Sequence, residues 1–177
     1  MKRTIWVFGV ISGLISSVLM LATLPFAHRI GYEHSLFVGY TVIVAAMLLV
    51  FFGIKSYRDT NGGHISFGKG FLIGLAITLI SCVFYVVTWE IMYFGFMPHF
   101  LDNYGDYMIQ KMQASGATQA AIQSKLEELK HMREMYNNPL INAAMTFIEP
   151  FPVGLGITLI SAAVLRRKAP REISGLT

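Results

Sequence analysis

Four long apolar runs, separated by polar segments, dominate the pattern of this chain. About 20 apolar residues, each rising ~1.5 Å along an α-helix, are enough to cross the ~30 Å hydrocarbon core of a bilayer. The runs are continuously apolar, whereas the strands of a membrane β-barrel alternate apolar and polar residues. The pattern therefore predicts four transmembrane helices, over residues 4–25, 36–54, 70–97 and 140–165.

A long polar segment, residues 98–139, separates the third and fourth runs. Apolar residues recur at helical spacing on both sides of Ser115 and Gly116, and Thr118 is placed to cap the second of two amphipathic helices. These helices either pack on each other or on the outer mouth of the bundle, which we favour, or they form a groove for a partner or a lipid. The predicted fold class is all-α, an integral membrane four-helix bundle in one domain (1–177), with an extracytoplasmic helical insertion between helices 3 and 4.

Turn, capping and proline residues indicate where these helices begin, end or break. Gly62 and Gly63 can supply the positive φ of a tight turn before the third helix, and Ser66 is placed to cap that helix. Pro150 lies inside the fourth run, where it lacks a hydrogen-bond donor and clashes with the preceding turn. We therefore expect the fourth helix to kink or break at Pro150.

Small residues mark faces on which helices can approach one another. Gly9, Gly13 and Ser17 share one face of the first helix, which lets another helix come close. The segments 71–81 (FLIGLAITLIS) and 151–161 (FPVGLGITLIS) match at eight of eleven positions. We interpret this match as a shared Gly/Thr/Ser packing composition.

The composition agrees with an integral membrane protein. Hydrophobic residues make up 54% of the chain and charged residues 14%, and the mean hydropathy is +0.55. The net charge of +4 does not indicate nucleic-acid binding, because the basic residues lie beside the ends of the apolar runs. Lys2 and Arg3 imitate the start of a signal peptide, but the run that follows is too long, so we expect a retained helix.

The chain shows little sign of catalytic chemistry. Cys82 is the single cysteine and lies in the third run, so neither a disulfide nor a cysteine metal site is expected. The five histidines form no i, i+4 pair and no HExxH pattern, which argues against zinc. No metal or cofactor is expected, and an enzyme is the least supported class.

Basic residues are distributed unequally between the two sides of the predicted bundle. Nine of the 14 Lys and Arg fall in the N-terminal segment, the loop between the second and third helices, and the C-terminal tail. Four of the other five are spread through residues 98–139, a long segment in which charge counts for less. The positive-inside rule therefore predicts that both termini are cytoplasmic and that 98–139 lies outside.

The loop between the second and third helices carries a resemblance to a known family. Its motif consists of Lys55, Tyr57, Arg58, Asp59, Gly62, Gly63, Ile65, Ser66 and Phe67. With the four runs and the helix start at 116–122, this motif resembles the bacterial membrane family catalogued as domain of unknown function 4199, over roughly residues 1–168. The resemblance implies a four-helix protein of the bacterial inner (plasma) membrane. It implies no activity and no catalytic residues.

Glu90 and Glu149 are carboxylates inside the apolar runs. At ~1.5 Å per residue they lie ~10 Å and ~14 Å from the outer ends of their helices. An ionised carboxylate there costs at least ~2.5 kcal/mol on insertion scales, so each should be protonated, paired or facing water. Either each is satisfied locally, with a Ser or Thr beside Glu149, or both line one polar cavity that holds a proton or a cation. Local partners available to Glu90 are Arg29, His28 and His99.

A second candidate site is a basic rim at the predicted cytoplasmic end. Its residues either anchor the topology or bind anionic lipid headgroups. They are Lys55, Arg58, Lys69, Arg166, Arg167 and Lys168.

These observations favour a structural, interaction or accessory role in the membrane. The alternative is a small proton- or cation-coupled transport module that uses Glu90 and Glu149. The expected partners are the lipid bilayer, with anionic lipids at the rim, and a second copy of the chain or another membrane protein. Nucleic acid is not an expected partner.

Overall fold

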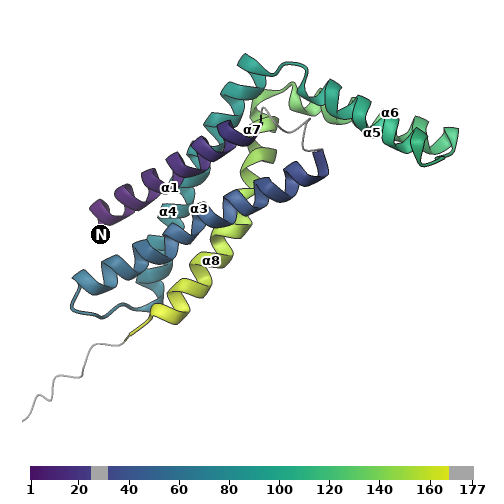
Figure 1. The fold of residues 1–177 in the computed structure, drawn as a ribbon. Coiled ribbons are helices and arrows are strands. Elements are labelled where there is room, and N and C mark those ends of the chain that lie inside the picture. Colours follow the sequence, from purple (N-terminus) through teal and green to yellow (C-terminus); the bar gives the residue numbers. More distant parts are fainter. Residues whose placement is uncertain (25–31, 168–177) are drawn as a thin grey trace, which may run out of the picture. The chain divides into compact units, whose positions relative to one another are not determined.

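The computed structural model describes residues 1–24 and 32–167, and the regular elements of these residues are helices (Figure 1). The chain divides into two compact units: a first unit of Met1–Tyr85 and Glu149–Thr177, and a second unit of Val86–Ile148. The helices are α1 (Lys2–Thr23), α3 (Tyr32–Thr60), α4 (Phe67–Ile91), the π-helix η2 (Met92–Phe96), α5 (Phe100–Ala114), α6 (Gln119–Tyr136), α7 (Pro139–Ile148) and α8 (Pro150–Leu165).

Four helical stretches are long and apolar enough to cross a membrane. They are Lys2–Thr23, Phe37–Thr60, Phe67–Phe96 and Pro139–Leu165. The prediction of an all-α fold with four such helices is confirmed, while the side of the membrane on which 98–139 lies stays a prediction. α3 continues past the predicted end at residue 54 to Thr60, because hydrophobicity marks only the part of a helix that suits lipid.

Helix α1 lies against α4 through the predicted stripe of small residues. A Cβ atom on Gly9 would lie 2.9 Å from the Cβ of Ile80, and one on Gly13 would lie 2.6 Å from the Cγ of Phe84. Contacts this short leave no room for a larger side chain. The prediction of a close helix approach along this face is confirmed.

A buried serine joins three helices of the first unit. The hydroxyl of Ser12 in α1 donates to the backbone carbonyl of Ala46 in α3, at 2.8 Å. It also lies 3.0 Å from the hydroxyl of Ser81 in α4, and both serines are fully buried. Their polar groups are therefore paired across helices instead of facing lipid.

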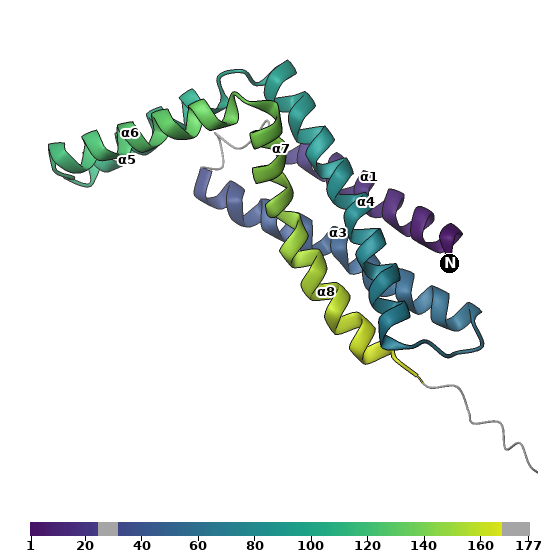
Figure 2. The same ribbon diagram turned by 180° about the vertical axis from the view of Figure 1, so that it is seen from behind.

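Helices α4 and α8 pack through reciprocal glycine and threonine contacts. A Cβ atom on Gly74 would lie 2.7 Å from the Cγ2 of Thr158, and one on Gly154 would overlap the Cγ2 of Thr78. The two threonine hydroxyls are 3.2 Å apart and fully buried. Both views show α4 and α8 side by side (Figures 1 and 2). The matching segments 71–81 and 151–161 thus contain the residues that contact one another.

The second unit contains the predicted pair of amphipathic helices, α5 and α6. Thr118 caps α6, since its Oγ1 accepts a hydrogen bond from the backbone N–H of Ala121 at 3.3 Å. Gly116 has a φ of +74° and makes the turn between the helices. The two helices lie side by side (Figure 2). Ile122 is the one buried residue of α6, and α5, described throughout its length, has none.

The fourth apolar run is broken where Pro150 predicts it. Helix α7 ends at Ile148, Glu149 lies in a turn, and α8 begins at Pro150. Proline suits the first position of a helix, where its missing N–H would have no partner. The expected kink or break is confirmed.

Candidate functional site

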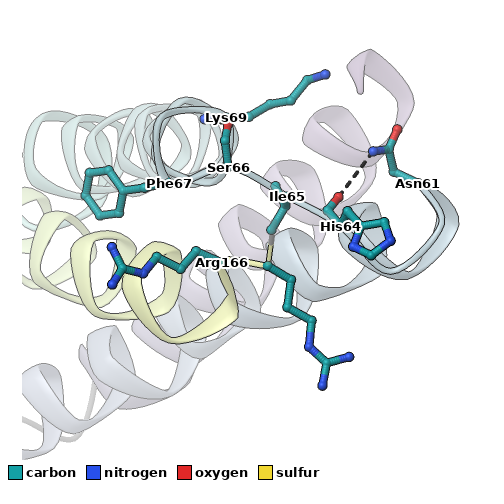
Figure 3. Close-up of a pocket in the computed structure, with 8 residues that line it drawn as sticks. Asn61, His64, Ile65, Ser66, Phe67, Lys69 and Arg166 are labelled. Carbon is teal, nitrogen blue, oxygen red and sulfur yellow. Dashed lines mark hydrogen bonds between the residues drawn. The ribbon is translucent and has the colours of Figure 1, made fainter. Parts of the chain in front are cut away.

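A pocket lies at the end of the first unit where the α3–α4 loop meets the chain that follows α8 (Figure 3). The two segments are joined by a β-bridge. The N–H of Ile65 donates to the carbonyl of Arg167 at 3.1 Å, and the N–H of Arg167 donates back to the carbonyl of Ile65 at 2.9 Å. The side chain of Ile65 is buried where the loop joins this bridge.

The loop folds this way because of its local sequence. Gly62 and Gly63 have φ values of +71° and +79°, as predicted for the turn. The side-chain amide of Asn61 donates to the carbonyl of His64 at 3.2 Å. The Oγ of Ser66 accepts from the N–H of Lys69 at 3.3 Å, which is the predicted cap of α4.

The pocket is electropositive. Its volume is about 720 Å³, and its lining residues are Asn61, His64, Ile65, Ser66, Phe67, Lys69, Arg166 and Arg167. None of them is acidic, and the N-terminus of α4, the positive end of that helix dipole, belongs to the same region.

Among the described residues, no carboxylate neutralises the cations of the pocket. Within residues 1–24 and 32–167, no ion pair joins Lys69, Arg166 or Arg167 to an acidic side chain. The Nζ of Lys69 lies 5.7 Å from the centre of the Tyr57 ring. The Nδ1 of His64 is buried and has no hydrogen-bond partner in the described part of the chain. The three cations therefore leave capacity for an external anion.

The structure brings together half of the predicted basic rim. Lys69, Arg166 and Arg167 line the pocket, whereas Lys55 and Arg58 do not. Arg58 instead forms an ion pair with the neighbouring Asp59, at 2.8 Å. Lys168 lies outside the described residues.

Sequence reasoning missed three polar members of the pocket, Asn61, His64 and Ser66. Ser66 carried a capping signal and Asn61 a turn signal, but no local pattern indicated that either lies near the arginines that follow α8.

Glu149, at the break between α7 and α8, belongs to the first unit. Its Oε2 accepts a hydrogen bond from the hydroxyl of Tyr85 at 3.0 Å, and its side chain is otherwise exposed. The donor is therefore a tyrosine of α4 and not the serine or threonine that the sequence suggested. Tyr85 supplies one of the hydrogen bonds that an intramembrane carboxylate requires.

Glu90 belongs to the second unit and is half-buried. Its Oε1 is buried without a hydrogen-bond partner among the described residues. His99 interacts with Asp102 at 3.3 Å, while His28 and Arg29 lie outside the described residues. Because Glu90 and Glu149 fall in different units, a cavity shared by both stays a prediction.

A buried amide that the sequence reasoning passed over organises the second unit. The side-chain oxygen of Asn142 in α7 accepts from the indole N–H of Trp89 at 2.8 Å and from the hydroxyl of Thr146 at 3.2 Å. Its amide nitrogen donates to the backbone carbonyl of Tyr136 at 3.1 Å. Asn142 is fully buried, so these bonds fix the positions of α4 and α7 within this unit. The sequence signal for this role was that Asn142 is a single amide side chain inside an apolar run.

The described residues contain no group of three or more His, Cys, Asp or Glu side chains that could hold a metal ion. Long apolar helices packed through glycine and hydroxyl side chains define the class, an α-helical multi-pass membrane protein.

The comparison with known families names the group within this class. A family model described as "Protein of unknown function (DUF4199)" matches residues 7–167, and the chain belongs to this family. The resemblance carried by the loop motif is thereby confirmed. No curated protein and no solved structure matches the chain.

Proposed function

We propose that this chain is a structural or accessory protein of the bacterial inner membrane that acts by contact with lipids and with other membrane proteins. The packing of the first unit carries this proposal. Four of its buried hydroxyls are paired with one another across helices, Ser12 with Ser81 and Thr78 with Thr158. Groups that satisfy one another hold helices together and are not available to a substrate.

The outer faces of the same helices support the proposal. Val18 in α1 is 61% exposed, and Ile160 and Val164 in α8 are 67% and 69% exposed. Apolar side chains that point outward from a packed bundle require lipid or another apolar protein surface. With both termini cytoplasmic, as the basic residues favour, the α5–α6 pair is available to partners on the outer side.

Cross-linking in native membranes tests the interaction role. A contact protein gives cross-linked species larger than the 19.8 kDa chain, formed with a second copy or with another membrane protein. A chain that remains monomeric at native expression, with an efficient cross-linker, contradicts the proposal.

Glu149 favours the alternative, a small proton- or cation-coupled module. Glu149 lies inside an apolar span, its side chain is exposed on the surface of the chain, and it accepts a hydrogen bond from Tyr85. Proton and cation pathways use carboxylates of this kind. The broken helix beside it is also common in transporters.

Flux measurements separate the two roles. The purified chain is placed in liposomes that contain a pH-sensitive dye, and the decay of an imposed proton, Na⁺ or K⁺ gradient is followed. A structural protein leaves the decay equal to that of protein-free vesicles. A transport module accelerates it, and Glu149→Gln then removes the acceleration. The matched control, Glu127→Gln on the exposed face of α6, leaves the decay unchanged.

A further inference from the structure

We propose that the pocket between the α3–α4 loop and the end of α8 binds the phosphate group of an anionic phospholipid. This inference rests on the membrane location in the proposed function and names one of the partners. The pocket lies where three apolar helices end, at Thr60, Phe67 and Leu165. In a bilayer, the ends of apolar spans lie at the level of the headgroups.

The charge of the pocket matches a phosphate oxyanion. Lys69, Arg166 and Arg167 contribute three positive charges, no lining residue is acidic, and none of the three cations has a carboxylate partner among the described residues. Arginine can present two parallel N–H donors to one phosphate, and lysine supplies a compact charge. Three such groups around one opening form a site that favours anions over neutral headgroups.

The pocket also offers neutral hydrogen-bond donors. Ser66 uses its oxygen as an acceptor from the N–H of Lys69, which leaves its own hydroxyl proton to donate. Asn61 donates once, to the carbonyl of His64, and its amide has a second N–H. These groups share the lining with the cations and can contact the remaining phosphate oxygens.

The arrangement of the cations favours a lipid over a free phosphate. In Figure 3 the side chains of Lys69 and Arg166 extend away from each other, so they stand at the edges of an open site. Phe67 lines the same pocket and is 41% exposed. Its ring stacks on that of Phe71, with 6.2 Å between the ring centres. An exposed apolar ring beside the cations can contact the acyl chains of a lipid whose phosphate the cations bind. A lipid in the bilayer is present at a high local concentration beside the pocket, so even an open site can bind it. The same open site would retain a small free anion poorly.

The β-bridge keeps the site in place. Ile65 and Arg167 exchange two backbone hydrogen bonds, so the arginines that follow α8 are held beside the loop that contains His64 and Lys69. A free tail with the same residues would attract anionic lipids without forming a pocket. A pocket should retain individual lipid molecules specifically, whereas a free basic tail should not.

Native mass spectrometry of the full chain tests the proposal. The protein, purified in mild detergent, is titrated with phosphatidylglycerol and, separately, with neutral phosphatidylcholine, and the fraction that retains a lipid is measured. The pocket variant is Lys69→Gln/Arg166→Gln/Arg167→Gln. We expect a clear preference for phosphatidylglycerol in the native chain and a loss of phosphatidylglycerol affinity on the order of a hundredfold in the pocket variant.

The control removes positive charges elsewhere at the same predicted side of the membrane, outside the predicted basic rim. It is Lys2→Gln/Arg3→Gln, whose side chains are exposed and do not line the pocket. We expect this variant to keep phosphatidylglycerol binding within a few-fold of the native chain. Circular dichroism and thermal unfolding of both variants establish that they are folded.

Three outcomes would overturn the proposal. Equal loss in the two variants would show diffuse attraction in place of a pocket, and equal retention of the two lipids would show that charge is not recognised. Inorganic phosphate or glycerol phosphate, added at millimolar concentration, should not displace the lipid; complete displacement would identify a soluble phosphate as the ligand. Cross-linking and flux are separate measurements, so the proposed function and this site can fail independently.

Discussion

The contact between α4 and α8 and the contact between α5 and α6 are two ways of pairing helices in one chain. The first relies on Gly74 and Gly154, whose backbones meet threonine side chains, with fully buried hydroxyls between them. In the second, Ile122 of α6 is buried and α5 has no buried residue. In lipid, exclusion of apolar groups from water no longer drives helices together, so close packing and hydrogen bonds must do so. The α5–α6 pair, which the sequence predicts to lie outside the membrane, can instead depend on a few partly buried apolar contacts.

The largest expected effect comes from filling the glycine contact. Gly154→Leu places a side chain where Thr78 already lies and should lower the free energy of unfolding by about 3 kcal/mol. Gly156→Leu is the matched control, because the same helix has open space at Gly156, with no atom within 4 Å of an added Cβ. Thermal unfolding in detergent micelles compares the two. Similar destabilisation would show that the cost comes from the helix itself and not from its contact with α4.

Removing the buried side chain of the α5–α6 pair should have a smaller and local effect. Ile122→Ala leaves a cavity and should destabilise this pair by about 2 kcal/mol, at the low end for buried aliphatic residues because the surrounding helices are largely exposed. Hydrogen exchange of α6 amides measures the loss. Leu126→Ala, at a position 44% exposed, serves as control and should change protection far less. Faster exchange throughout α1, α3 and α8 would contradict a local role.

The smallest effect is expected at the ion pair between the two amphipathic helices. Arg133 contacts Asp102 at 2.8 Å, and the two side chains are 56% and 31% exposed. Arg133→Gln should therefore cost only about 0.2–1 kcal/mol, since water screens exposed pairs. The difference from the native chain should disappear in 1 M salt, where the Debye length falls to about 3 Å. A difference that persists in high salt would mean that Arg133 contributes through packing instead.

Signals that depend on neighbouring residues could be read from the sequence. The apolar runs predict the spanning helices, Ser66 and Thr118 act as caps, and Pro150 marks the break. Each of these features follows from the chemistry of one short segment. The similarity of 71–81 to 151–161 was also visible, and its interpretation as packing composition agrees with the contacts between Gly74 and Thr158 and between Gly154 and Thr78.

Pairings between distant segments could not be read in this way. The bridge from Ile65 to Arg167 joins residues far apart in the sequence, and neither segment shows the alternation of a strand. The role of Asn142 depends on Trp89, which lies in another helix. Lys69, Arg166 and Arg167 were predicted as part of a rim, but their shared pocket with Asn61 and His64 depends on the bridge.

The same bridge sets an order of events during synthesis. The α3–α4 loop leaves the ribosome long before Arg167, so the backbone groups of Ile65 have this partner only after α8 has been made and inserted. Until then the loop lacks the partner that holds it, and the pocket has neither of its arginines. The pocket therefore exists only on a molecule in which α8 has returned to the side where the loop lies, and a chain stalled before α8 would have no such site.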